Sequence, residues 1–263
     1  MMRMKACIAR YRRSPVIRFC AKQCRSFTKR YENLNYDVDS NGESRVLKQL
    51  SKFSFSCLFD VGANEGDWAL RASRLYPAAI VHAFEIMPQT YQVLRGKTAG
   101  CKNVIAVNRG LLDEEKEVDL KYFPENSTVT SVYDVPYPGE YKMIKAKVTR
   151  GDDYVAGGGI PFIDLLKIDV EGAEHLVLKG FQECLRNRKI AVIQFEYGKA
   201  NILSRFLLAD YYDFFRQYGY KIGKIYPTYV DFRDYDLDHE DFIGPNYLAV
   251  QEDRNDLLKE LMG

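Results

Sequence analysis

A short apolar segment followed by a glycine-rich turn constrains the fold of this chain more than any other feature. Cys57–Val61 reads C-L-F-D-V, which is typical of a strand buried on both faces of a parallel sheet. Residues 62–66 read G-A-N-E-G, and residues 65–76 then have apolar side chains at helical spacing until Pro77. This order predicts a strand–turn–helix unit whose glycines let a ligand approach the backbone and whose first helical amides face an anionic group.

The same alternation of strands and helices continues along the chain. Further strands are expected at 79–84, 104–107, 163–170, 190–195, 221–226 and 247–250, and helices at 41–51, 88–95 and 202–218. Residues 117–123 and 142–148 instead alternate apolar and polar side chains around a loop rich in tyrosine, which predicts an inserted β-hairpin. The pattern indicates an α/β, Rossmann-like fold: a mostly parallel sheet with helices on both faces.

In such a sheet, ligands bind beyond the carboxyl ends of the strands, where few polar side chains are expected here. They are Asp60 with residues 62–66, then Glu85, Asn108, Asp169, Glu171, Glu196 and Tyr197. Glu85 follows the glycine turn at the distance from which a carboxylate accepts both hydroxyls of an adenosine ribose. Asn64 stands where the dinucleotide fingerprint G-x-G-x-x-G requires its second glycine, which argues against a nicotinamide enzyme.

Three segments resemble the FkbM family of methyltransferases. They read D-V-G-A-N-E-G at 60–66, F-E-I-M-P at 84–88 and L-K-I-D-V-E-G-A-E at 166–174, and the last is the most specific. The resemblance implies a seven-stranded class I methyltransferase fold, S-adenosylmethionine as the methyl donor, and a hydroxyl acceptor on a sugar or natural product. By position it assigns the cofactor turn to Asp60, Gly62, Asn64 and Gly66, and the ribose carboxylate to Glu85.

The sequence departs from the family pattern at two places. The family more often has F-E-P where residues 84–88 read F-E-I-M-P, and Leu-Asp where residues 150–153 read R-G-D-D. The second departure leaves Asp152 a weak site candidate. Asn108, which follows the third strand, completes the predicted cofactor-binding set.

The expected catalytic residues are Asp169, Glu171 and Glu196, which end neighbouring strands. A sugar hydroxyl is too weakly acidic to react without proton removal or metal polarisation. One of the three carboxylates is therefore expected to act as a base, or all three hold Mg²⁺ as hard oxygen ligands. The alternative for Asp169 and Glu171 is helix capping, and His175 is expected to be a packed helix residue rather than a base.

The charge of the chain is unevenly distributed. Residues 1–31 carry ten Lys or Arg and no acid, so the rest has 28 bases against 36 acids. We expect a basic extension at 1–40, a catalytic domain at 41–252 and a tail at 253–263. The extension is a solvated segment, a transit peptide, or a peripheral contact with anionic membrane through residues 1–31. The acidic remainder argues against nucleic acid as a partner.

These features together predict an O-methyltransferase that acts on a sugar, glycan or glycosylated metabolite. Six scattered cysteines fit a cytoplasmic protein, peripheral to the membrane if the extension binds it. The alternatives are a non-catalytic protein that keeps the fold, and a methyltransferase acting on nitrogen or on a non-sugar acceptor. The sequence lacks an N-P-P-Y motif after the fourth strand, which argues against base N-methylation.

Overall fold

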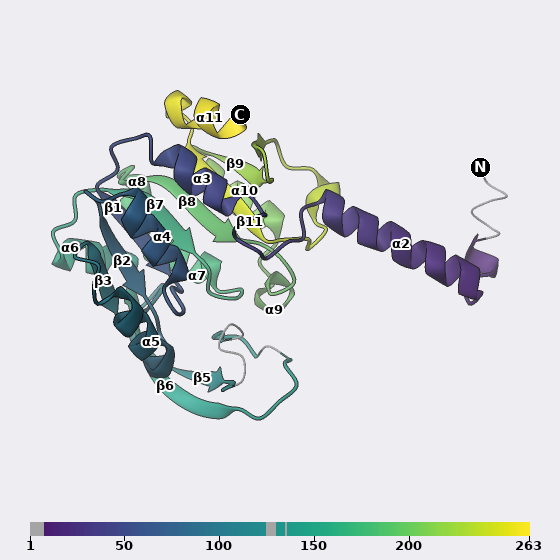
Figure 1. The fold of residues 1–263 in the computed structure, drawn as a ribbon, viewed down its shortest axis with the longest axis horizontal. Coiled ribbons are helices and arrows are strands. Elements are labelled where there is room, and N and C mark those ends of the chain that lie inside the picture. Colours follow the sequence, from purple (N-terminus) through teal and green to yellow (C-terminus); the bar gives the residue numbers. More distant parts are fainter. Residues whose placement is uncertain (1–7, 125–129, 135) are drawn as a thin grey trace.

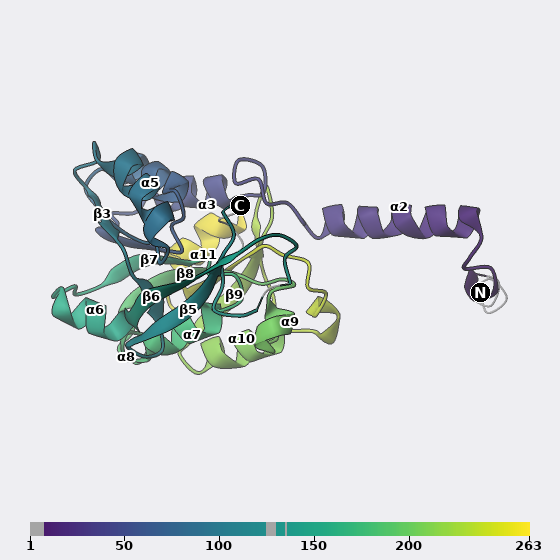
Figure 2. The same cartoon turned by 90° about the horizontal axis from the view of Figure 1, so that it is seen from below.

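A central sheet lies between two layers of helices in the computed structural model, which describes residues 8–124, 130–134 and 136–263 (Figures 1 and 2). The strands of this sheet are β1 (Cys57–Val61), β2 (Ile80–Phe84), β3 (Val104–Val107), β7 (Ile163–Ile168), β8 (Ile190–Glu196), β9 (Tyr220–Ile225), β10 (Val230–Phe232) and β11 (Asn246–Gln251). Their spatial order is β10-β9-β11-β8-β7-β1-β2-β3. The five strands from β8 to β3 pair in parallel, and β11 pairs antiparallel with both β8 and β9.

The sheet confirms the predicted class I methyltransferase architecture but has eight strands instead of seven. The additional strand, β10, pairs antiparallel with β9 at the edge of the sheet. It has only three residues, so it is too short to show the alternation by which a strand is recognised in a sequence.

The two helical layers cover opposite faces of the sheet (Figure 2). On one face lie α3 (Glu43–Leu50), α4 (Asp67–Leu75), α5 (Pro88–Thr98) and α11 (Asn255–Met262); on the other lie α6 (Gly151–Gly157), α7 (Glu174–Gly180), α8 (Gln182–Arg186) and α10 (Leu208–Arg216). Strand alternation divides the core accordingly. Leu58 packs with the first layer and Phe59 with the second, because successive strand side chains point to opposite faces.

The helix expected at 202–218 is interrupted in the structure. A short helix, α9 (Asn201–Ser204), ends at Arg205, whose φ of 56° is left-handed, and α10 begins at Leu208. The carboxylate of Glu240 accepts hydrogen bonds from the N–H groups of Leu208 and Ala209, at 3.2 and 2.7 Å. This new helix start depends on a residue far along the chain, so local spacing could not predict it.

The C-terminal segment is part of the domain instead of a tail. Leu257, Leu258 and Leu261 of α11 are buried in the core layer that also contains α3 and α4. Three leucines within one short helix supply enough apolar surface to hold the chain end against the sheet.

The predicted hairpin is confirmed and belongs to a second, smaller sheet. Strands β5 (Lys116–Tyr122) and β6 (Lys142–Arg150) pair antiparallel, and β4 (Gly110–Leu112) pairs parallel with β6. No local pattern in the sequence predicts β4. It places Leu111 and Leu112 beside the carboxyl end of β2, where a ligand cavity lies.

The N-terminal part divides at Glu32. Helix α2 (Pro15–Tyr31) extends away from the body and has no buried residue (Figure 1). The segment after it packs on the domain: Asn33 is buried, and its Nδ2 donates to the carbonyl oxygens of Asn41 and Ile225 at 2.8 and 2.9 Å. Within the described ranges, the structure contains no helix that is both long enough and apolar enough to span a membrane.

Candidate active site

The glycine turn after β1 is held by its own backbone and by a neighbouring strand. Gly62 has a φ of 82°, and a Cβ at this position would lie 1.9 Å from the backbone oxygen of Asp169. Its N–H and that of Ala63 both donate to the carbonyl oxygen of Phe84, at 3.0 and 2.8 Å. These two amides are therefore already paired within the protein and are not available to a ligand. Glycine is required here because two backbone segments approach too closely for a side chain.

Glu85 is the predicted ribose-binding carboxylate, and it lies buried beside the turn. Its two oxygens accept hydrogen bonds from the N–H groups of Asn64 and Met87, at 2.9 and 2.8 Å. Burial raises the pKa of Glu85 to about 7, although these two amides oppose the rise. Each carboxylate oxygen has a second lone pair, so Glu85 keeps the capacity to accept hydroxyl groups from a ligand.

A cavity opens next to Glu85, and we call it the Glu85 cavity. Its apolar wall comes from the ends of β2, β4 and β6, from β5 and from the loop that follows β5: Ile86, Leu111, Leu112, Leu120, Val132 and Val148. Gly110 also lines it, and a Cβ there would lie 2.7 Å from Ile86 Cδ1. An apolar slot beside a carboxylate suits a flat heterocycle attached to a ribose, so the residues fit the adenosine part of S-adenosylmethionine. No local pattern assigns the β4 and hairpin residues to this wall.

The predicted cofactor residues separate into two groups. Gly62, Asn64 and Glu85 line the Glu85 cavity. Gly66 instead allows α4 to pack against α5, because a Cβ there would lie 2.5 Å from Leu94 Cδ1. The side chain of Asn108 donates from Nδ2 to the carbonyl oxygens of Glu85 and Ile86, at 2.9 and 3.3 Å, so it fixes the turn that carries Glu85.

Asp60, the remaining predicted cofactor residue, is fully buried and paired with a lysine. Lys167 Nζ lies 3.4 Å from Asp60 Oδ1 and 3.1 Å from Asp169 Oδ2. Burial lowers the pKa of Lys167, but Asp169 and Asp60 raise it more, so the net shift is upward and the lysine is charged. Lys167 therefore connects the floor of the glycine turn to the predicted catalytic cluster, a link that the sequence analysis missed.

The structure brings the three predicted catalytic carboxylates together. One oxygen each from Asp169, Glu171 and Glu196 lies within 4.8 Å of the others. Burial raises the pKa of Glu171 to about 8, with a further contribution from Asp169. Burial, Asp169 and Glu171 raise the pKa of Glu196 well above its usual value. Perturbed carboxylates in a cavity are the kind of group that proton transfer requires.

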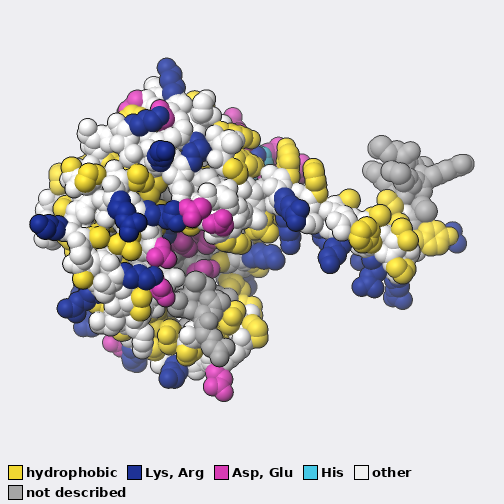
Figure 3. Space-filling view, in the orientation of Figure 1, with side chains coloured by type: hydrophobic (Ala, Val, Ile, Leu, Met, Phe, Trp, Pro, Cys, Tyr) yellow, Lys and Arg dark blue, Asp and Glu magenta, His cyan; other side chains and the backbone are white. Residues whose placement is uncertain are grey.

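A second cavity, which we call the carboxylate cavity, opens over this cluster. It is lined by Tyr36, Pro136, Asp169, Glu171, Gly172, Glu174, Glu196 and residues 198–203. Asp169 and Glu171 also line the Glu85 cavity, so the two cavities meet at these side chains. Figure 3 shows acidic side chains gathered in a hollow of the body. Tyr36, from the segment expected to be an extension, was not predicted as a site residue.

Two of the four tyrosines in the hairpin and its loop pack on the hairpin itself. Tyr137 and Tyr141 contact the ring of Phe123, with centroids 5.1 and 5.9 Å apart. Tyr133 Oη lies 3.3 Å from His175 Nε2, and the two rings stack. Neither cavity defined above is lined by Tyr122, Tyr133, Tyr137 or Tyr141. Burial lowers the pKa of His175, which fits the expected packed residue rather than a base.

Glu174 supports the loop that carries Glu171. Its Oε1 accepts hydrogen bonds from the N–H groups of Val170 and Gly172, at 3.0 and 3.1 Å, and its buried Oε2 has no partner among the described residues. Glu171 itself has a left-handed φ of 54°. Glu174 thus holds the loop before α7, and no side chain among the described residues caps the start of that helix. Asp169 and Glu171 therefore do not cap it and face the cavities.

Replacing Glu174 with glutamine is expected to stabilise the protein above neutral pH. Burial raises the pKa of Glu174 to about 7 in the folded state, so folding favours its protonated form. That contribution is complete below the unfolded pKa and is lost as the pH rises through about 7. Glutamine keeps the oxygen that accepts both N–H groups and carries no charge. Urea unfolding at pH 8 should show a gain of about 1–3 kcal/mol that disappears near pH 4.

The matched control for Glu174→Gln is Glu252→Gln, which removes the same charge from an exposed position. It should leave the free energy of unfolding unchanged at both pH values. A Glu174→Gln variant that is less stable than the wild type at pH 8 would show that the buried carboxylate contributes more as an ion than its burial costs.

Comparison with known proteins identifies the family. A model of the methyltransferase FkbM domain matches residues 60–222, which is more than half of the chain. The hexuronic acid methyltransferase AglP of Haloferax volcanii is 28% identical over 190 residues, which cover 71% of this chain and 76% of AglP. The 31-O-demethyl-FK506 methyltransferase FkbM of Streptomyces tacrolimicus is 30% identical over 156 residues, which cover 48% of this chain and 59% of that relative.

A solved structure, the methyltransferase FkbM of Methylobacillus flagellatus, matches with a TM-score of 0.48 at 16% identity, over 75% of this chain and 43% of that one. The family match extends from the last polar residue of β1 into β9, so it includes the glycine turn, Glu85 and all three clustered carboxylates. The chain therefore belongs to the FkbM family of S-adenosylmethionine-dependent methyltransferases.

Proposed function

We propose that the protein transfers a methyl group from S-adenosylmethionine to a hydroxyl group of a sugar, a glycan or a glycosylated metabolite. The observation that carries the proposal is the meeting of two cavities at Asp169 and Glu171. The Glu85 cavity suits the adenosine of the donor, and the carboxylate cavity offers a polar, acidic space to a hydroxyl-bearing acceptor. The relative AglP acts on a hexuronic acid by its name, which supports a sugar as the acceptor.

Two of the three carboxylates, Glu171 and Glu196, contact the acceptor hydroxyl in this proposal, and the third, Asp169, is held by Lys167. Bound S-adenosylmethionine supplies an electrophilic methyl group. Lys167 orients Asp169 through a 3.1 Å contact. Glu171, whose pKa of about 8 makes it a stronger base than an ordinary carboxylate once it is ionised, receives the proton of the acceptor hydroxyl. Glu196, whose pKa lies well above its usual value, is protonated and donates a hydrogen bond to the acceptor.

Transfer of tritiated methyl groups to a panel of glycans and glycosylated metabolites tests the acceptor class. We expect label in a form that resists mild base, as an ether on a sugar hydroxyl does and a methyl ester on a sugar carboxylate does not. Label found only in amines, proteins or aglycones without a sugar would contradict the proposed acceptor.

Mg²⁺ bound by Asp169, Glu171 and Glu196 is the alternative chemistry of the same cluster, because carboxylate oxygens are the ligands that this ion prefers. The charged Lys167 contacts Asp169, and it would repel a divalent cation at this place. We therefore expect turnover to be unchanged by EDTA. Loss of turnover in EDTA, with recovery on adding Mg²⁺, would assign the cluster to metal binding instead.

A further inference from the structure

Helix α2 separates its charged and apolar side chains onto two stripes. The basic stripe comprises Arg18, Lys22, Arg25 and Lys29, spaced by four, three and four residues, so they lie along one side of the helix. The apolar stripe comprises Val16, Cys20, Phe27 and Tyr31 on the opposite side, and Phe19 and Arg30 lie along one edge of it. Figure 3 shows hydrophobic and basic side chains exposed along the projecting segment. Phe19 is 62% exposed and Phe27 is 71% exposed, so this apolar surface is uncovered.

Such a helix gains little from remaining free in water. An isolated helix of this length is marginally stable, and most helices are held by packing of an apolar face. Here α2 has no packed face, because none of its residues is buried against the body. The exposed apolar stripe of α2 therefore favours binding to a partner with an apolar interior.

The charge of the segment identifies the kind of partner. Residues 1–31 carry ten Lys or Arg and no acid, which favours an anionic surface. A second copy of α2 would bring two strongly basic helices together, which is unfavourable. Nucleic acid is anionic but would leave Phe19 and Phe27 in water. A bilayer with anionic lipids satisfies both stripes, since it takes apolar side chains between headgroups and attracts Lys and Arg nearby.

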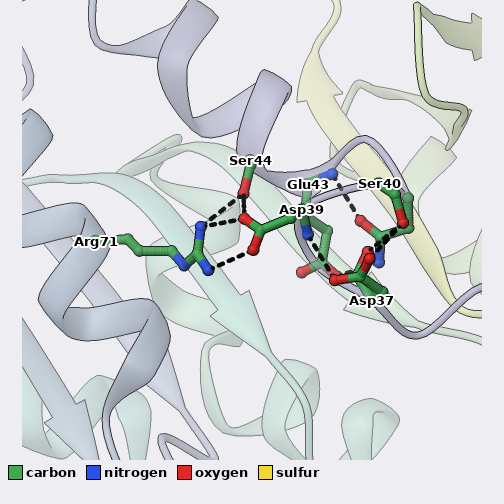
Figure 4. A network of polar contacts seen from close by, with 7 residues as sticks. Asp37, Asp39, Ser40, Glu43, Ser44 and Arg71 are labelled. Atoms are coloured by element: carbon green, nitrogen blue, oxygen red, sulfur yellow. Dashed lines mark hydrogen bonds and ion pairs between the residues drawn. The ribbon is translucent and has the colours of Figure 1, made fainter.

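The segment that follows α2 ties the helix to the active site. Glu32 accepts hydrogen bonds from Lys224 Nζ and Tyr226 Oη, both at 3.1 Å. A few residues on, Asp39 pairs with Arg71 of α4, in the network shown in Figure 4. Between these anchors, Tyr36 lines the carboxylate cavity.

Neighbouring hydrogen bonds support the ion pair between Asp39 and Arg71. Asp37 accepts from Ser40 Oγ at 2.6 Å, and Ser44 Oγ lies 3.3 Å from Asp39 Oδ1 (Figure 4). The loop between α2 and α3 is thus fixed on the body at both ends. Only a few residues of fixed chain therefore separate the end of α2 from Tyr36, which lines the carboxylate cavity.

We propose that α2 binds the surface of an anionic lipid bilayer, with its apolar stripe among the headgroups and its basic stripe beside them. The arrangement presents the carboxylate cavity to acceptors at the membrane surface. Binding by α2 does not depend on methyl transfer, so this proposal can fail or succeed separately from the proposed function.

Flotation of the full chain with lipid vesicles tests this proposal. The vesicles contain phosphatidylcholine alone, or with about 30 mol% phosphatidylglycerol, an anionic content chosen to give a surface potential of the physiological kind. We expect binding to the anionic vesicles only, and weaker binding at high salt. The variant R18E/K22E/R25E/K29E should bind at least about tenfold more weakly, because each base near the surface contributes to attraction.

The matched control reverses four exposed lysines of the body, as K102E/K189E/K221E/K259E. It changes the net charge equally and should retain vesicle binding. Both variants should bind S-adenosylhomocysteine as the wild type does, which confirms that each is folded. Equal loss of vesicle binding in both variants would overturn the proposal, since it would reflect net charge alone.

Two further outcomes would also overturn it. One is a dimer in the absence of lipid that the double variant Phe19→Ser/Phe27→Ser dissociates, combined with no vesicle binding, which would assign α2 to a second copy of the chain. The other is tight binding to single-stranded RNA, abolished by the α2 variant, with no binding to anionic vesicles.

Discussion

Replacing Glu171 with glutamine should lower kcat by about 10²–10⁴-fold while leaving the affinity for S-adenosylhomocysteine within about twofold, because general-base catalysis contributes on this scale. Glutamine has nearly the same shape and cannot accept the proton of the acceptor hydroxyl. The loss should therefore appear in kcat more than in donor binding. Steady-state kinetics with an identified acceptor, together with calorimetry of the donor product, separate the two effects.

The pH dependence gives this prediction a second readout. Burial raises the pKa of Glu171 to about 8, so the base is protonated and inactive at lower pH. The kcat of the wild type should rise with pH and level off above about 8, and the residual activity of Glu171→Gln should lack this rise. Glu252→Gln is the exposed control and should behave as the wild type. A Glu171→Gln variant with normal kcat would remove Glu171 from the catalytic role, and Asp169→Asn would be the next test.

Substituting alanine for Gly62 is expected to weaken S-adenosylhomocysteine binding by more than about tenfold and to destabilise the fold by about 2–5 kcal/mol. The added Cβ would lie 1.9 Å from the backbone oxygen of Asp169, so one of the two backbone segments must move. The φ of 82° adds strain for any residue with a side chain. Both segments line the Glu85 cavity, so the movement changes the cavity itself.

Gly96→Ala is the control for this substitution. Gly96 lies in α5, and a Cβ there meets nothing within 4 Å. Alanine should leave donor binding unchanged and slightly increase stability, because it restricts the unfolded chain and favours the helix. Urea unfolding and calorimetry measure both variants. A Gly62→Ala protein with wild-type stability and affinity would show that the turn tolerates a side chain.

The sequence predicted the parts of the fold that depend on local patterns. Apolar runs and helical spacing located the seven main strands, and the string at 166–174 placed Asp169 and Glu171 beside Glu196. It also predicted Glu85 and Gly62 at the cavity that fits adenosine. Each of these residues lies at or just after the end of a strand that is buried on both faces. The apolar run of the strand therefore locates the residue in the sequence.

The remaining parts depend on contacts between distant segments. Lys167 was read as part of a strand, and only the sheet brings its Nζ to Asp60 and Asp169. Tyr36 lies on the cavity wall because Glu32 and Asp39 are fixed by residues far along the chain. Strand β4 forms by pairing with β6 across the hairpin, which no local pattern encodes. The same holds for α10, whose start is capped by Glu240.

Asn108 shows how a position can be predicted correctly while its contacts differ. Asn108 does follow β3, but its side chain binds the backbone of Glu85 and Ile86. The amides of Gly62 and Ala63 bind the oxygen of Phe84. In both cases a hydrogen-bond partner within the protein was close enough.

Calorimetry of S-adenosylhomocysteine with the wild-type chain tests the central claim most directly, because it needs no acceptor. The glycine turn, Glu85 and the apolar wall of the Glu85 cavity predict one-to-one binding in the micromolar range. Glu85→Ala should weaken that binding, since the ribose would lose its hydrogen-bond acceptor. An absence of measurable binding by the folded wild-type protein would contradict the assignment of this cavity to the methyl donor, and the proposed methyl transfer with it.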